Sequence, residues 1–125
     1  MYKLLLMSGV LSVAVTALAA DSGVTRKVFD RMDVPSGYET VVGAAGLSEG
    51  SALGRHSHHG TEFGYVAEGE IELAIDGMSP QRLKAGEFFK IDAGKIHDAR
   101  SVGGAAKAVV TWVVEKGKPL AEPAK

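Results

Sequence analysis

Hydrophobic and polar positions alternate in short runs along most of this chain. Between residues 70 and 76, for instance, Ile71, Leu73 and Ile75 alternate with polar neighbours, and a period of two is typical of a strand with one buried face. No stretch of ten or more residues after residue 20 has a clear helical period. The chain's 16 glycines separate the runs, as turns between many short strands do. The pattern therefore predicts an all-β protein.

The turn signals divide the chain into short segments with strand character. The sequence predicts strands over 27–29, 38–43, 51–58, 63–67, 71–75, 81–84, 87–91, 96–102 and 108–114. Asp76-Gly77 is a strong hairpin signal. The polar tail from Lys116 contains Pro119 and Pro123, and we expect it to fray or to lie along the surface. Strands of this number and spacing favour an antiparallel sandwich or barrel.

Residues 1–20 have the features of a secretory signal peptide. Lys3 gives a positive start, residues 4–20 carry no charge, and the stretch ends in small residues. An apolar run of this length also permits an uncleaved membrane anchor. We interpret it as a cleaved signal, which leaves one domain over 21–125, periplasmic or secreted, with no membrane association after cleavage.

The amino-acid composition excludes several classes of binding partner and of site chemistry. The absence of cysteine excludes disulfides, thiolate metal ligands and a cysteine nucleophile. Lysine and arginine number 14 against 15 acidic residues, with no run of like charge, so the sequence predicts no nucleic-acid partner. A small-molecule ligand or substrate is the expected partner.

A histidine cluster is the strongest chemical signal. Three of the four histidines lie within residues 56–59. In a strand His56 and His58 point to one face, and after a turn Glu62 begins the returning strand near them. Two imidazoles and a carboxylate on one face form a facial triad of metal ligands. His97, on a later strand, can complete the set if the sheet closes into a barrel. His59 is interpreted as a solvated turn residue.

The spacing of these residues resembles that of the cupin superfamily. The first cupin motif is matched at every position by Gly50, His56, His58, Glu62 and Gly69. The second motif is matched in register by Gly86, Gly94 and His97. Asp92 stands where a proline is usual, and Ser101 where an asparagine is usual. These two departures affect the turn before His97 and a hydrogen bond that would support a metal ligand, and neither position is itself a metal ligand.

The resemblance implies a single-domain jelly-roll β-barrel whose core spans about 38–114. It implies that His56, His58, Glu62 and His97 point inward and bind one divalent metal ion, with iron, manganese, nickel and zinc all acceptable. It also implies a homodimer, as in other small single-domain cupins. Affinity for the metal should fall as the pH drops through histidine titration.

Two octahedral positions left open by four ligands can accept water, dioxygen or a chelating substrate. The leading hypothesis is a metal-dependent enzyme, dioxygenase-like, acting on a small organic substrate. One alternative is a non-catalytic module that binds or senses a metal or a small ligand. Another is a metal-dependent isomerase or lyase acting on sugar acids, which basic residues inside the barrel would favour. The sequence shows no separate nucleophile or general base.

Several side chains near the ligands are interpreted as structural. Core positions are expected for Phe63, Tyr65, Phe89, Ile91 and Trp112. Arg55 is expected to face outward, opposite His56, and not to bind an anion.

Overall fold

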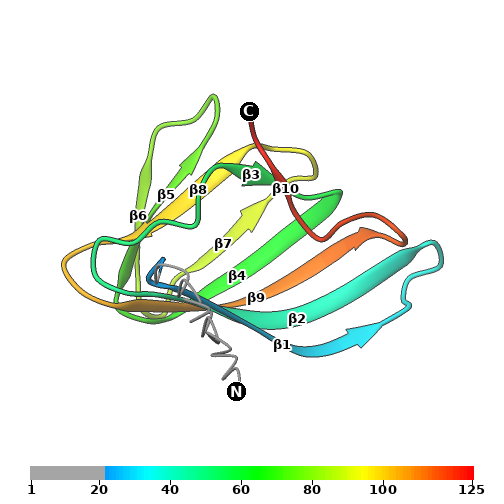
Figure 1. Ribbon diagram of the computed structural model, residues 1–125, viewed down its shortest axis with the longest axis horizontal. Helices are drawn as coiled ribbons and strands as arrows, with labels where there is room; N and C mark the ends of the chain where they lie inside the picture. Colours follow the sequence, from blue (N-terminus) through cyan, green and yellow to red (C-terminus); the bar gives the residue numbers. More distant parts are fainter. Residues whose placement is uncertain (1–21) are drawn as a thin grey trace, which may run out of the picture.

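The computed structural model describes residues 22–125, which form two antiparallel β-sheets around one core (Figure 1). Sheet A has the order β1 (Val24–Met32), β2 (Tyr38–Leu47), β9 (Ala106–Glu115), β4 (Gly60–Glu68) and β7 (Phe88–Ile91). Sheet B has the order β10 (Glu122–Pro123), β3 (His56–Ser57), β8 (His97–Ser101), β5 (Glu70–Ile75) and β6 (Gln81–Lys84). The predicted all-β architecture is confirmed. Within residues 22–125, no helix is long and apolar enough to span a membrane. The predicted signal peptide over 1–20 lies outside the described residues.

The core lies between the two sheets and is built from the inward side of each strand. Val66 in sheet A and Leu73 in sheet B are among its most deeply buried side chains. Burying one such aliphatic side chain stabilises a fold by about 2 kcal/mol. Because side chains alternate between faces along a strand, the buried positions of β4 and β5 recur at every second residue.

Strand pairing aligns the inward positions of sheet A in rows. Trp112 on β9 lies opposite Val41 on β2 and opposite Glu62 on β4. Four residues earlier on β9, Ala108 lies opposite Ala45 and Val66. These rows define the inner face of sheet A and fix which side chains share the barrel interior.

Most predicted strands are present, but three segments differ. The segment predicted as a strand over 51–58 pairs as a strand only at His56–Ser57, with a single bridge from Ala52 to Arg100. The short edge strand predicted over 27–29 is a nine-residue strand along β2. The C-terminal tail, expected to fray or lie along the surface, forms β10 against β3.

The predicted core positions of Phe63 and Tyr65 are wrong. Their exposed fractions are 37% and 50%, and the Phe63 ring stacks on Phe88 outside the barrel, with ring centroids 6.4 Å apart. Phe63 directly follows Glu62, so it points to the opposite face of β4. Phe89 and Ile91 are buried, as predicted.

The turn between β4 and β5 depends on Gly69. Its φ angle is +73°, and a Cβ built there would lie 2.3 Å from the carbonyl oxygen of Ala105. Both facts exclude a larger residue without backbone movement. This glycine is also the last position of the first motif found in the sequence.

Candidate metal centre

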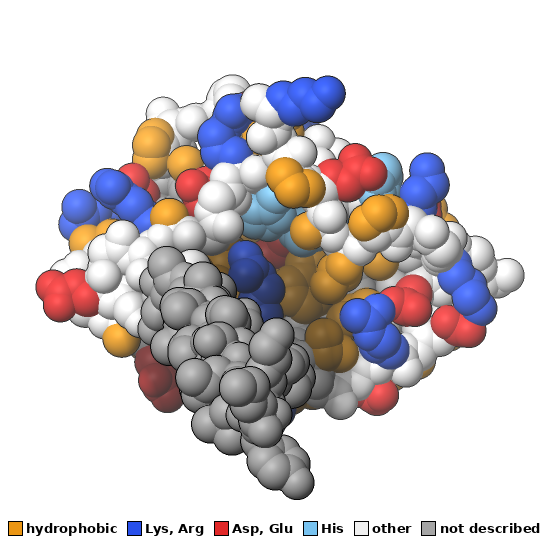
Figure 2. Space-filling view, viewed as in Figure 1, with side chains coloured by type: hydrophobic (Ala, Val, Ile, Leu, Met, Phe, Trp, Pro, Cys, Tyr) orange, Lys and Arg blue, Asp and Glu red, His pale blue; other side chains and the backbone are white. Residues whose placement is uncertain are grey.

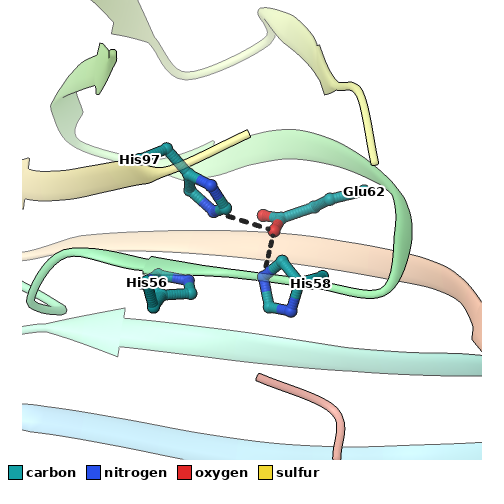
Figure 3. A group of neighbouring side chains, drawn as sticks. All are labelled: His56, His58, Glu62 and His97. Atoms are coloured by element: carbon teal, nitrogen blue, oxygen red, sulfur yellow. Dashed lines mark ion pairs between the residues drawn. The ribbon is translucent and has the colours of Figure 1, made fainter. Parts of the chain in front are cut away.

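Four side chains from both sheets converge at one end of the barrel (Figure 3). His56 lies on β3, directly opposite His97 on β8, and His58 follows β3 in the chain. Glu62 comes from β4 in sheet A. One ligand atom from each side chain lies within 4.8 Å of the others. The structure therefore brings together all four residues that the sequence singles out as metal ligands.

Gly60 allows the chain to reverse between His58 and Glu62. It lies opposite Val114 in the β4–β9 pairing, and a Cβ built there would lie 1.8 Å from the carbonyl oxygen of Val113. Only a glycine permits this close approach of the two strands. The approach sets the register that places Glu62 opposite Trp112.

The centre is compact and largely shielded from solvent. The exposed fractions of His58, Glu62 and His97 are 5%, 6% and 2%, respectively, and His56 is half-buried. Glu62 Oε2 lies 2.8 Å from Nε2 of His58 and 3.3 Å from Nε2 of His97. The His56 ring lies beside both other rings, with centroids 4.9 Å from that of His58 and 4.3 Å from that of His97.

Each imidazole is oriented by a backbone carbonyl. Nδ1 of His56 is 2.6 Å from the carbonyl oxygen of Gly54, Nδ1 of His58 is 2.5 Å from that of Leu120, and Nδ1 of His97 is 2.9 Å from that of Lys95. A carbonyl can only accept, so Nδ1 carries the ring proton and donates it. All three Nε2 atoms are thereby left as lone-pair donors. Metal-binding histidines usually donate their other ring N–H to a carbonyl or carboxylate in this way.

This arrangement fits a bound cation. With the proton on Nδ1, the Nε2 lone pairs of His58 and His97 point at a carboxylate oxygen that is itself an acceptor. Within residues 22–125, His97 Nε2 is buried and has no hydrogen-bond partner, although Glu62 Oε2 is close. Acceptors at this distance repel each other unless a proton or a metal ion lies between them. Three neutral imidazoles and one carboxylate are ligands that iron, manganese, nickel and zinc accept.

Trp112 contributes a hydrogen bond that the sequence did not indicate. It packs against the core, as expected, but its indole Nε1 also donates to Glu62 Oε2 at 3.1 Å and lies 3.3 Å from Nε2 of His58. A buried indole N–H usually finds an acceptor. This general preference was the one signal in the sequence that Trp112 could reach a polar site.

The electrostatics of the centre favour an ionised carboxylate. Burial raises the pKa of Glu62, but hydrogen bonds and charge interactions with His58 and His97 outweigh it and lower the pKa to about 2. Burial lowers the pKa of His56, and its backbone hydrogen bond only partly offsets this. Burial also lowers the pKa of His97, but the contact of its protonated form with Glu62 and the bond to Lys95 raise it overall. Glu62 is therefore a charged ligand at neutral pH.

The centre lies in a cavity of about 430 Å³ between the sheets. In Figure 2 its opening is a hollow in which pale-blue histidines lie beside orange apolar side chains. Its walls are mostly aliphatic, with Phe89 and Trp112 as the aromatic members, and residues 120 and 121 of the tail border it. Such a site suits a small, largely apolar molecule that reaches the metal position.

Three other residues considered in the sequence lie away from the centre. Arg55 is exposed and pairs with Asp76, as its predicted outward orientation requires. His59 is half-buried rather than solvated, and its Nε2 is 2.9 Å from Glu122 of β10. The Ser101 hydroxyl donates to the carbonyl oxygen of Ser48 and not to a ligand.

Comparisons with solved structures identify the same fold in other proteins. An uncharacterized conserved protein with a double-stranded β-helix domain from Klebsiella pneumoniae has a TM-score of 0.68 at 22% identity, covering 93% of this chain and 99% of that one. KdgF from Halomonas sp. has a TM-score of 0.66 at 18% identity, covering 80% and 86%. Oxalate oxidase in complex with glycolate has a TM-score of 0.66 at 24% identity, covering 90% and 61%.

Other matches are longer proteins than this one. The chain spans 43% of the DMSP lyase DddQ from Ruegeria pomeroyi, with a TM-score of 0.63 at 21% identity. A comparison with curated protein sequences gives no match. Residues 45–114, more than half of the chain, match the family model described as "Cupin domain". The chain therefore belongs to the cupin family.

Proposed function

We propose that this cupin binds one divalent metal ion through His56, His58, Glu62 and His97 and is a metal-dependent enzyme for a small organic substrate. The observation that carries the proposal is the convergence of three Nε2 atoms and one carboxylate, each imidazole being held by its own carbonyl. A site whose donors are already oriented loses little freedom when it binds a metal.

The cavity lining favours a reaction that needs no separate acid or base. Among its described residues, Glu62 is the only carboxylate, and none carries a hydroxyl or a thiol. General acid–base catalysis needs such a group, an imidazole or an amine within hydrogen-bond reach of the substrate. In this cavity the histidines are assigned to the metal, and Lys27 and Lys107 occupy outward positions on their strands. A bound ion supplies Lewis acidity and, if it is iron(II), redox chemistry with dioxygen. We therefore propose a dioxygenase-like reaction on a substrate that chelates the metal.

The same evidence from the cavity disfavours one of the two alternatives and is equally compatible with the other. Arg26 lines the cavity, which favours an isomerase or lyase for sugar acids, but the mostly aliphatic walls would leave the hydroxyl groups of such a substrate without partners. A non-catalytic binding module fits the absence of a catalytic base equally well. The names of the structural neighbours, which include a lyase and an oxidase, are compatible with either reaction class, because one fold hosts many functions.

Metal content provides the first test. Untagged protein recovered from its native compartment is expected to contain close to one metal ion per chain by elemental analysis, and His58→Ala should lose most of it. His59→Ala is the matched control, since His59 is adjacent but lies outside the ligand group, and it should retain the metal. Equal metal content in all three proteins would reject the site.

Oxygen uptake separates the enzyme from the binding module. The iron-loaded protein is expected to consume oxygen with at least one compound in a panel of enolizable diketones and catechols. Thermal stabilisation by a panel compound without any turnover would instead support the binding module.

The proposal also covers the cellular location and the oligomeric state of the protein. We propose that the protein is exported by residues 1–20 and acts in the periplasm or outside the cell, which the position of the mature N-terminus would test by mass spectrometry. We also propose a homodimer, supported by Phe63, Tyr65 and Phe88 on the outer face of sheet A. Light scattering of the mature protein tests this, and a monomer at micromolar concentration would reject it.

A further inference from the structure

The cavity contains one feature that the metal centre does not use, a basic side chain on its inner wall. We propose that Arg26 binds a carboxylate at the end of the cavity away from the metal centre, so that the ligand is a small acid with a metal-chelating head, an apolar body and an anionic end. This inference rests on the proposed function, because it assumes that the ligand's other end reaches the metal.

Strand register places Arg26 on the inward side of β1, although its side chain remains exposed to solvent. On β1 it lies opposite Ala45 of β2, and Ala45 lies opposite Ala108, which belongs to the inner face of sheet A. Paired residues on neighbouring strands point to the same face. Arg26 also lines the same cavity as the four metal ligands. Figure 2 shows a basic side chain within this hollow, between the histidines and the apolar wall.

The other basic residues around the cavity are accounted for. Lys27 and Lys107 alternate with inward residues on their strands, so they point outward, and Lys27 lies over the Phe29 ring at 5.4 Å. Arg55 is paired with Asp76. Within the described range 22–125, the Arg26 guanidinium forms no hydrogen bond or ion pair. It is the cationic group left to bind a ligand.

The position of Arg26 relative to the metal centre defines the shape of the ligand. Glu62 lies opposite Trp112, and Arg26 lies in the row of Ala108, four residues earlier on β9. Four residues of a strand span about 13 Å, and the arginine side chain bridges part of that distance. The wall between the two rows is apolar, with Val110 and Phe89 facing inward. A guanidinium at the far end of an apolar wall recognises a carboxylate by paired hydrogen bonds.

Two probes of equal chain length test the assignment. 2-Oxoadipate and 2-oxohexanoate share a chelating 2-oxo acid head and differ only in a terminal carboxylate or methyl group. Calorimetry with the zinc-loaded protein, in which no redox turnover occurs, is expected to show tighter binding of 2-oxoadipate by about tenfold. Arg26→Gln should abolish this preference and leave 2-oxohexanoate binding unchanged.

Two control variants distinguish contact from general electrostatics. Lys27→Gln removes the same charge one residue away on the outer face and should keep the preference. Arg26→Lys keeps the charge without the planar fork and should keep part of it. Circular dichroism and zinc content confirm that each variant is folded and loaded. No preference in the parent, a preference that persists in Arg26→Gln, or no binding of either probe to zinc-loaded protein would overturn the assignment. A parent that binds no zinc would reject the proposed function itself.

Discussion

Replacement of Trp112 by phenylalanine tests whether the indole N–H supports the metal centre. The variant keeps an aromatic ring against the core and removes the donor that lies 3.1 Å from Glu62 Oε2. Glu62 is 6% exposed, so water cannot readily replace that donor. The carboxylate would then be free to rotate away from the position in which it meets Nε2 of His58 and His97.

The size of the effect follows from the charge of the acceptor. The two histidines outweigh the effect of burial and lower the pKa of Glu62 to about 2, so the indole donates to an ionised group at neutral pH. Hydrogen bonds to charged groups contribute about 1.5–3 kcal/mol, equivalent to roughly 10- to 100-fold in a dissociation constant. Removal of a group that hydrogen-bonds to a metal ligand typically weakens metal binding over the same range. We expect zinc affinity to fall by at least about tenfold.

A competition titration against a chromogenic chelator measures this affinity in parent and variant alike. Val110→Ala is the matched control, because Val110 is buried on the same face of β9 and touches no ligand atom that the structure identifies. It should lower the free energy of unfolding by about 2 kcal/mol and leave zinc affinity unchanged. An unchanged affinity in Trp112→Phe, or an equal loss in both variants, would refute the argument.

Three further results are expected. Truncation after Lys118 removes the Leu120 carbonyl that holds His58, so zinc affinity should fall about tenfold in the same titration. Glu122→Gln keeps this carbonyl and should leave zinc affinity unchanged. Chelation of zinc should lower the melting temperature by roughly 10 to 20 °C relative to protein at a free zinc level near 100 times the dissociation constant, and a constant melting temperature would contradict specific binding. The pKa of His97 is raised above 6.5, so its proton competes with the metal as the pH falls. Zinc affinity measured over a pH series should therefore begin to decline above pH 6.5. A decline that starts only well below pH 6.5 would contradict the geometry.

The ligand set is predictable because most of it is local. His56, His58 and Glu62 lie within seven residues, and alternation along a strand with one reversal at Gly60 is enough to bring them together. The same rule shows why the prediction for Phe63 and Tyr65 failed. If Glu62 points into the barrel, the next residue must point out, so an inward Glu62 and a core Phe63 exclude each other.

The groups that hold the metal ligands in place are not predictable in this way, because their positions depend on pairing between distant strands. The contact of Trp112 with Glu62 requires the register of β9 against β4, and several registers are compatible with the apolar pattern of β9. The carbonyl of Leu120 carries no side-chain signal at all. It reaches His58, 62 residues earlier in the chain, because β10 pairs with β3.

The segments that flank the matched family span also border the metal-binding cavity. The family match spans residues 45–114, which includes all four ligands and Trp112. Arg26 precedes that span and Leu120 follows it, yet both border the same cavity as the metal centre. The matched span supplies the metal ligands and most of the cavity wall, and β1 and the tail complete that wall. Since β1 is an edge strand with only β2 beside it, its inward residues can change without disturbing the ligands, and a different substrate then needs no change at the metal.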